Sequence, residues 1–125
     1  MILVDTSVWI DHLRANDERL SQLLMDGQVL VHPFVTGELA LGNLKNRDEV
    51  LMMMQDLPQA TVATVAEVLR LIKMQNLFGL GIGYLDAHLL ASVLLVPGSR
   101  LWTRDKRLLS AATQLGISVN MTHQL

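Results

Sequence analysis

The chain has 125 residues, half of them hydrophobic, and a formal net charge of -2 at neutral pH. This length fits one domain that buries about two thirds of the surface its unfolded chain exposes. The absence of cysteine excludes disulfides and thiol chemistry and is typical of a reducing compartment. No apolar run reaches the about 18 residues of a membrane span, and the N-terminus lacks the basic segment of a signal peptide. We therefore expect a single cytoplasmic domain over residues 1–125, with no membrane segment.

Short strand and helix signals alternate along the chain. Apolar and β-branched runs predict five strands, at residues 2–4, 29–31, 61–63, 100–103 and 117–119. Helical patterns predict seven helices, at about residues 7–14, 17–26, 33–42, 47–57, 65–77, 84–96 and 106–115. This alternation predicts parallel strands joined by right-handed crossovers, with helices on both faces of the sheet.

Local signals support several of these boundaries. Asn46 with Glu49, and Thr64 with Glu67, have the spacing of a capping box at a helix start. The glycine-rich residues 79–83 match neither GxGxxG nor a phosphate-binding P-loop, and we interpret them as a tight turn before the helix at 84–96.

Two aspartates follow predicted strands directly. Asp5 ends the run ILV, and Asp105 comes two residues after LWT. In open α/β folds the carboxyl edge of the sheet is where ligands bind. Each aspartate could instead be a helix N-cap, although Thr6 or Ser7 could cap the first helix equally well.

Two further acids lie in apolar helices. Glu38 is three or four residues from Phe34, Val35 and Leu41, which places it on the apolar face. Asp86 lies in a first helical turn among leucines. A buried carboxylate is costly unless it is paired or metal-bound. The alternatives are an arginine partner for Glu38 and a favourable helix dipole for Asp86.

Together these acids form a candidate metal site. Four oxygen-donor side chains from four elements, without cysteine or a convincing histidine partner, suit a hard cation such as Mg²⁺ or Mn²⁺. His88 is two residues from Asp86, about 200° around the helix, so we expect it to point away.

Four blocks of sequence, VDTSVWID, TGEL, GIGYLDAHLLA and LWTRDKRL, resemble those of PIN-domain proteins of the VapC toxin type, and the likeness covers nearly the whole chain. The resemblance implies a three-layer α/β/α domain with a parallel sheet of about five strands. It also implies a metal-dependent endoribonuclease whose acidic site corresponds to Asp5, Glu38, Asp86 and Asp105. In that family the first and third of these are the surest metal ligands, whereas the last varies in how directly it binds.

The resemblance also implies partners and products. RNA cleavage would leave 5′-phosphate and 3′-hydroxyl ends. A VapB-type antitoxin would cover the site with its C-terminal segment, and the toxin would form a homodimer.

Several other residues are candidates for binding RNA. Ser7 and Thr103 could hold a water or a phosphate oxygen, or could only cap helices. The net charge by itself argues against nucleic-acid binding, but four of the ten bases lie within residues 100–107. Of these, we expect Arg104, Lys106 and Arg107 to contact phosphates; the alternative is a solvated charge run.

Two other functions remain open. A phosphatase of the haloacid dehalogenase type would need a second aspartate two positions after Asp5, where this chain has Ser7. A catalytically silent PIN-fold module that binds RNA or protein would keep the fold without turnover.

Overall fold

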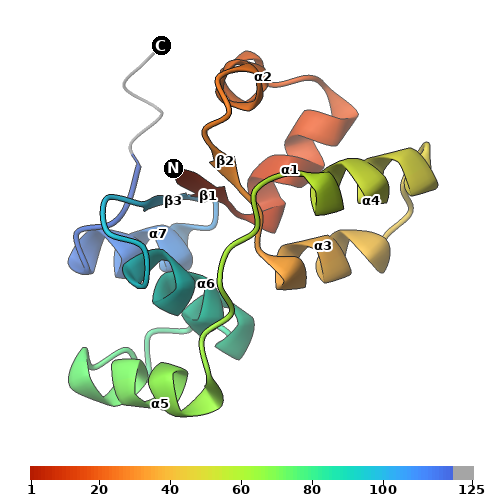
Figure 1. Cartoon of the computed structure of the whole chain (residues 1–125). Helices are drawn as coiled ribbons and strands as arrows, with labels where there is room; N and C mark the ends of the chain where they lie inside the picture. The colour runs from red at the N-terminus through yellow and green to blue at the C-terminus, as the bar shows by residue number, and fades with distance from the viewer. Residues whose placement is uncertain (120–125) are drawn as a thin grey trace.

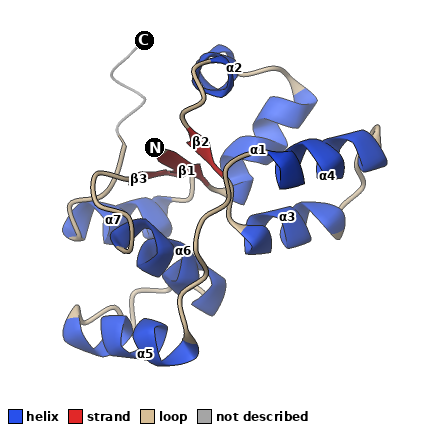
Figure 2. Ribbon diagram, viewed as in Figure 1, coloured by secondary structure: helices blue, strands red, loops and turns tan. Residues whose placement is uncertain are grey.

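A small parallel sheet lies at the centre of the fold. The computed structural model describes residues 1–119 and contains strands β1 (Ile2–Val4), β2 (Val29–Leu30) and β3 (Arg100–Trp102) in the order β2-β1-β3. Figure 2 shows these strands in the middle of the molecule, surrounded by helices. Both neighbours of β1 pair with it in parallel, with Leu3 opposite Leu30 and Leu101. The predicted parallel sheet is confirmed.

The described residues contain three strands rather than five. On each side of the sheet, one further segment pairs through a single parallel bridge. Val31 pairs with Gln59 after β2, and Leu101 of β3 pairs with Ser118. The expected strand at 61–63 is wrong, because the chain pairs only around Gln59. The carbonyl of Thr61 instead accepts a hydrogen bond from the Ser92 hydroxyl at 2.7 Å, so the chain turns away from the sheet there. The expected strand at 117–119 is reduced to the second bridge.

Seven helices surround the sheet within residues 1–119, as the sequence predicted. Their bounds are α1 (Thr6–Arg14), α2 (Glu18–Met25), α3 (Pro33–Ala40), α4 (Arg47–Asp56), α5 (Val65–Met74), α6 (Tyr84–Leu94) and α7 (Lys106–Gln114). Figure 1 shows α1, α3 and α4 grouped on one side of the sheet and α6 and α7 on the other, with α5 beside α6. No helix in the described part is long and apolar enough to cross a membrane.

The core fixes β1 and α6, the two elements that carry central acids. Leu3 and Val4 of β1 are fully buried, and so are Leu89 and Leu90 of α6. Every residue of α6 from 87 to 93 is buried. Burial on this scale contributes about 1.5–3 kcal/mol for each large apolar side chain. This packing therefore fixes the backbone of both elements, and with it the positions of the acids at their ends.

The two predicted capping boxes have different outcomes. Thr64 and Glu67 form the box at the start of α5, as expected. The box at Asn46 is wrong: this residue has a left-handed backbone, with φ +52°, and makes no side-chain cap. The guanidinium of Arg47 bonds the carbonyls of Ala40 and Gly42. These bonds fix the turn between α3 and α4, and asparagine tolerates the left-handed backbone that the turn needs.

Candidate metal and nuclease site

Asp5 stands at the carboxyl end of β1 and is 6% exposed. It occupies the N-cap position of α1 but makes no side-chain capping bond. Its Oδ2 instead accepts hydrogen bonds from Ser7 Oγ at 2.8 Å and Thr103 Oγ1 at 2.7 Å. Asp5 is therefore a buried carboxylate whose hydrogen bonds come from two side-chain hydroxyls and not from the N-terminus of α1.

The hydroxyls of Ser7 and Thr103 connect Asp5 to the turn between β3 and α7. Ser7 Oγ accepts from the backbone N–H of Arg104, and Thr103 Oγ1 accepts from that of Asp105, both at 3.0 Å. Each hydroxyl thus donates to Asp5 and accepts from the β3–α7 turn. This arrangement orients the carboxylate of Asp5 relative to Asp105.

Asp105 does cap a helix. Its Oδ1 accepts from the backbone N–H groups of Arg107 and Leu108, at 2.9 and 3.0 Å, at the start of α7. The side chain is exposed. The N-cap interpretation therefore accounts for Oδ1 of Asp105. The negative charge of this residue also acts on Asp86.

Asp86 lies in the first turn of α6, partly buried, and its Oδ2 accepts from the backbone N–H of Gly83 at 3.0 Å. Burial raises the pKa of its carboxyl, and the negative charges of Asp5 and Asp105 raise it further, against the Gly83 hydrogen bond that lowers it. Asp5 and Asp105 are therefore close enough to Asp86 for their charges to act on it.

Glu38 contacts α1, the helix that follows Asp5. Its Oε1 accepts from Thr6 Oγ1 at 2.7 Å, beside Asp5 in the chain. The prediction that Glu38 lies on the apolar face is wrong, since the side chain is exposed. Leu41, expected as an apolar neighbour, lies beyond the end of α3 and is 91% exposed. Glu38 is therefore at the edge of the buried stripe formed by Val35 and Leu39.

The basic residues of the LWTRDKRL block divide into two kinds. Arg104 forms ion pairs with Asp11 at 2.7 Å and Asp17 at 2.5 Å, and its guanidinium lies over the Trp102 ring. These pairs raise the pKa of Arg104 although burial opposes them. Arg104 thus fastens the start of α7 to α1 and the turn before α2. Lys106 and Arg107 are exposed, and the Arg107 guanidinium lies beside Gly81 of the turn before α6.

The donor set fits a hard divalent cation. All four candidate acids offer carboxylate oxygens, which Mg²⁺ and Mn²⁺ prefer. Within residues 1–119 no three acidic or histidine side chains already have metal-binding spacing. Each carboxylate is turned to a protein donor, and charges interact over longer distances than coordination bonds. Binding of a cation would therefore require the carboxylate side chains to rotate while the strand and helices that carry them stay in place.

Two histidines are buried, one at the start of α3 and one in α6. His88 is buried, with its ring against Phe34 and Tyr84. These contacts are those of a histidine packed in the interior of the fold. His32 is fully buried, and burial together with the charge of His88 lowers its pKa to about 4. Its Nδ1 accepts from the Phe34 N–H, so Nε2 carries the proton and donates to Ser92.

The sequence missed three of the residues that shape the site. Thr6 was considered only as a cap, yet it contacts Glu38. Asp11 and Asp17 hold Arg104, from 93 and 87 residues away in the chain. Such distant pairs leave no local pattern, so only the fold reveals them.

The fold and the acidic site together define a class of protein. The PIN domain family model matches residues 2–114, and the chain belongs to this family. Within it, the chain is 56% identical over 119 residues to Ribonuclease VapC32 of Mycobacterium tuberculosis, in both strain CDC 1551 / Oshkosh and strain ATCC 25618 / H37Rv. That match covers 95% of this chain and 96% of the relative. The chain is therefore a member of the VapC group.

A solved structure supports the fold. The crystal structure of PAE2754 from Pyrobaculum aerophilum superposes with a TM-score of 0.61, covering 98% of this chain and 90% of that one. The two sequences are 18% identical, so the comparison concerns the fold alone.

Proposed function

We propose that this chain is a metal-dependent endoribonuclease, the toxin of a toxin–antitoxin pair, and that its four acids form the catalytic site. Its place in the VapC group supports the ribonuclease activity. One observation carries the assignment of the site: Asp5 is buried at the N-cap position of α1, yet its side chain does not cap that helix.

In this proposal Asp5, Glu38, Asp86 and Asp105 hold Mg²⁺, with Mn²⁺ as a possible substitute. The bound cation supplies positive charge that activates water and stabilises the charge developing on the phosphodiester. Ser7 and Thr103 keep Asp5 oriented, and Glu38 or Asp105 positions the water. The products would carry 5′-phosphate and 3′-hydroxyl ends.

The exposed cations of α7 supply the contact with RNA. Lys106 and Arg107 lie within two residues of Asp105 and face solvent, so they can contact backbone phosphates next to the site. Arg104 contributes indirectly, because its ion pairs hold the turn that presents these two residues.

The assignment is tested by incubating the purified chain with structured RNAs in Mg²⁺, in EDTA, and as the Asp5→Asn variant. Cleavage in Mg²⁺ alone is expected, with at least about a hundredfold loss in the other two conditions. Folding of the variant is checked by circular dichroism. Cleavage that survives EDTA or the substitution would contradict the metal mechanism, and RNA binding without turnover would favour the silent binding module.

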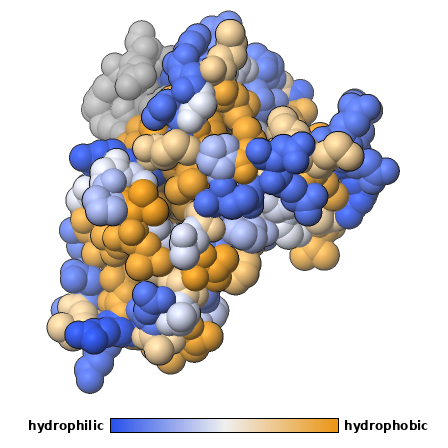
Figure 3. Space-filling view, viewed as in Figure 1, coloured by the Kyte–Doolittle hydropathy of each residue, from blue (hydrophilic) through white to orange (hydrophobic). Residues whose placement is uncertain are grey.

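Two protein partners complete the proposal. A VapB-type antitoxin would cover the acids with its C-terminal segment, and both proteins would act in the cytoplasm. A homodimer is supported by exposed apolar side chains on α5, including Val65 and Leu69 at 61% and 56% exposure. Figure 3 shows hydrophobic residues gathered over the region of α5 and α6.

The homodimer is tested by light scattering of the chain and of its Leu69→Lys variant. Val65 and Leu69 are four residues apart, so they share one face of α5. A dimer that becomes a monomer in the variant is expected. A dimer unaffected by the substitution would place the interface elsewhere.

A further inference from the structure

A close approach joins the turn before α6 to the start of α7. Gly81 lies in that turn, and a Cβ atom at this position would come 2.8 Å from Nη1 of Arg107, 3.0 Å from its Cδ and 3.1 Å from its Cζ. Carbon atoms that are not bonded to each other pack at about 3.5–4.0 Å. The Arg107 side chain therefore lies directly on the backbone of Gly81, in space that any other residue would fill.

This approach connects the elements that carry two of the proposed catalytic acids. Gly83, two residues after Gly81, donates its backbone N–H to Asp86 at 3.0 Å. Arg107 donates its own backbone N–H to Oδ1 of Asp105 at 2.9 Å. The backbone of Arg107 is thus bonded to one acid, while its guanidinium lies on the turn that is bonded to the other.

The turn is held more firmly than the arginine side chain. Leu77, just before the turn, is 3% exposed, and Ile82 packs against the buried core. Gly81 itself has a left-handed backbone, with φ +78°, which favours glycine. Arg107, by contrast, is exposed, and its guanidinium is the far end of a flexible side chain. A larger residue at position 81 would therefore displace the guanidinium and leave most of the turn in place.

The guanidinium of Arg107 has no acidic partner. Within residues 1–119 the ion pairs are those of Arg19 and Arg104, and no carboxylate lies within ion-pair distance of Arg107. A cation that rests on a backbone turn, with no acid of its own, is available to an anionic ligand, and guanidinium binds phosphate well because it can donate two parallel hydrogen bonds.

We propose that Gly81 is a positioning residue for RNA binding: because it has no side chain, the guanidinium of Arg107 can lie on the turn that holds Asp86 and contact a backbone phosphate beside the cleaved bond. Contact with the turn restricts the rotamers of a long side chain before RNA binds, which lowers the ordering cost of the phosphate contact. This inference rests on the proposed function, and it gives a role in that function to the glycine-rich turn.

Gly79 provides the matched control for backbone strain. It lies in the same turn and has a similar left-handed backbone, with φ +74°, but a Cβ atom there would meet nothing within 4 Å. Gly79→Ala and Gly81→Ala should therefore lower the melting temperature by similar amounts. Only Gly81→Ala should displace Arg107.

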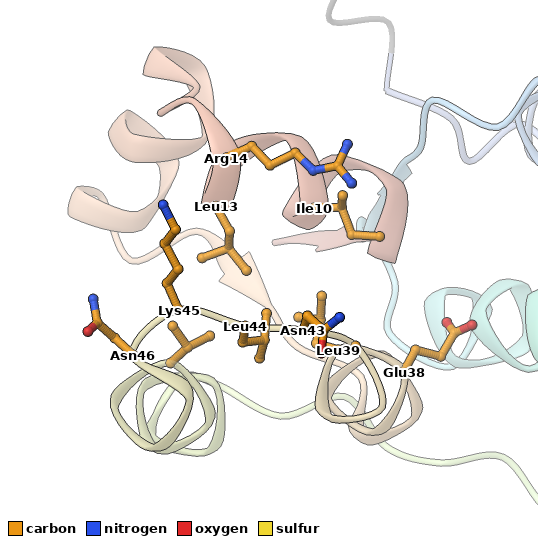
Figure 4. A pocket seen from close by; sticks show the side chains of 11 residues that line it. Ile10, Leu13, Arg14, Glu38, Leu39, Asn43, Leu44, Lys45 and Asn46 are labelled. Atoms are coloured by element: carbon orange, nitrogen blue, oxygen red, sulfur yellow. The ribbon is translucent and has the colours of Figure 1, made fainter.

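Lys45 provides the control for positive charge. It is exposed and forms no ion pair within the described residues. It lines the cavity between α1 and α3 that Glu38 also borders, and Figure 4 shows these two side chains at opposite sides of the view. Lys45→Gln removes one positive charge, as Arg107→Gln does. If net charge alone decided RNA affinity, the two variants would be equal.

RNA binding is measured apart from cleavage, by fluorescence anisotropy of a labelled single-stranded RNA in EDTA at several salt concentrations. Arg107→Gln should weaken binding about tenfold and Gly81→Ala about three- to tenfold. In both, the slope of log affinity against log salt should fall by about 0.7, the value for one phosphate contact on a single strand. The controls Gly79→Ala and Lys45→Gln should change the affinity by less than about twofold.

The same variants are compared in cleavage assays with Mg²⁺. Arg107→Gln and Gly81→Ala should raise the KM for RNA, with kcat within about threefold, because the contact is made before and during the reaction alike. The double variant Gly81→Ala/Arg107→Gln should bind RNA as weakly as Arg107→Gln alone, within about twofold, because Gly81 acts through Arg107.

One measurement needs no substitution, so it applies even if Gly81→Ala does not fold. In NMR spectra of the wild-type chain, we expect a nuclear Overhauser effect between the Hα protons of Gly81 and the Hδ protons of Arg107. Addition of the RNA in EDTA should shift the Nε–H signal of Arg107. Absence of either signal change would overturn the inference.

The other outcomes separate this inference from the proposed function. Full RNA affinity in Gly81→Ala, an equal loss in Gly79→Ala, or losses that add in the double variant would overturn the positioning role. Should RNA still be cleaved in Mg²⁺ in that case, the nuclease assignment stands and only this inference fails. RNA affinities in the expected order without any cleavage would support the inference while the nuclease assignment failed.

Discussion

Helices α5 and α6 begin with the same hydrogen bond, but the pKa of the carboxyl group in the first turn is shifted in opposite directions. At each start, the backbone N–H of the N-cap residue donates to a carboxylate three residues later: Thr64 to Glu67 at 2.8 Å, and Gly83 to Asp86 at 3.0 Å. The pKa of Glu67 is lowered by its bonds with Thr64. The pKa of Asp86 is raised, first by burial and then by the charges of Asp5 and Asp105.

The difference comes from tertiary structure and not from the local motif. Glu67 is exposed, and its hydrogen bonds with Thr64 favour the charged form. Asp86 is partly enclosed by the fold and near two other acids. One carboxylate therefore serves its helix, whereas the other is held at a cost that a bound cation would offset.

The largest expected effect is on the rate of RNA cleavage, and it distinguishes Asp86 from Glu67. Asp86→Asn should lower the initial rate of RNA cleavage in Mg²⁺ by at least about a thousandfold, because a metal ligand is lost. Glu67→Gln should leave the rate within about twofold. Equal losses in both variants would show that α6 has no special role.

The threonines that accompany these acids should differ in the same way. Thr103→Val removes a hydroxyl that orients Asp5 and should lower the cleavage rate about 10- to 100-fold, as for outer groups that orient metal ligands. Thr64→Val removes the α5 cap and should lower the melting temperature without changing the rate of the folded protein. Thermal melts and rates on the same preparations test this pair. A full rate for Thr103→Val would mean that Asp5 needs no such support.

Magnesium should stabilise the fold through Asp86 of α6 and not through Glu67 of α5. Millimolar Mg²⁺ should raise the melting temperature of the wild-type chain by several degrees, because a ligand that binds only the folded state stabilises it. Asp86→Asn should abolish the shift and Glu67→Gln should retain it. An unchanged wild-type melting curve would argue against the cluster.

The smallest expected effect is in the pH dependence of stability without metal. Because the folded pKa of Asp86 is raised, its ionisation destabilises the fold at neutral pH, and this penalty disappears as pH falls through that pKa. Glu67 has a lowered pKa, so its stabilising effect is present above its unfolded value of 4.5 and disappears on acidification. At neutral pH Asp86→Asn should therefore be more stable than the wild type and Glu67→Gln less stable.

Urea unfolding in EDTA between about pH 3 and 7 measures both differences. Both differences in unfolding free energy from the wild type should shrink towards acid pH. The difference for Asp86→Asn should start positive at neutral pH, and that for Glu67→Gln should start negative. Two differences of the same sign would contradict the contrast between the helices.

The sequence predicted elements whose signals are local. The apolar run before Asp5, the strand before Asp105 and the box at Thr64 lie within a few residues, and all three appear in the structure. The alternation of strands and helices likewise predicted the parallel sheet.

Features that depend on distant partners were not predictable from local patterns. The ion pairs of Arg104 join residues far apart in the chain, so its contacts with Asp11 and Asp17 could not be predicted from the local charge run. Asn46 has a capping sequence, but the bonds of Arg47 impose a different turn. The exposure of Glu38 depends on how α3 packs, and Leu41, expected on the same face, lies beyond the end of the helix, which periodicity places only within a few residues.

The central claim, that the acids around Asp86 hold a divalent cation, is tested most directly by titrating Mn²⁺ and following free Mn²⁺ by electron paramagnetic resonance. The wild-type chain and Glu67→Gln should bind Mn²⁺ with the same affinity, and Mg²⁺ should displace it. Asp86→Asn should bind at least about tenfold more weakly, because it loses a negatively charged ligand. Equal Mn²⁺ binding by Asp86→Asn and Glu67→Gln would contradict the claim.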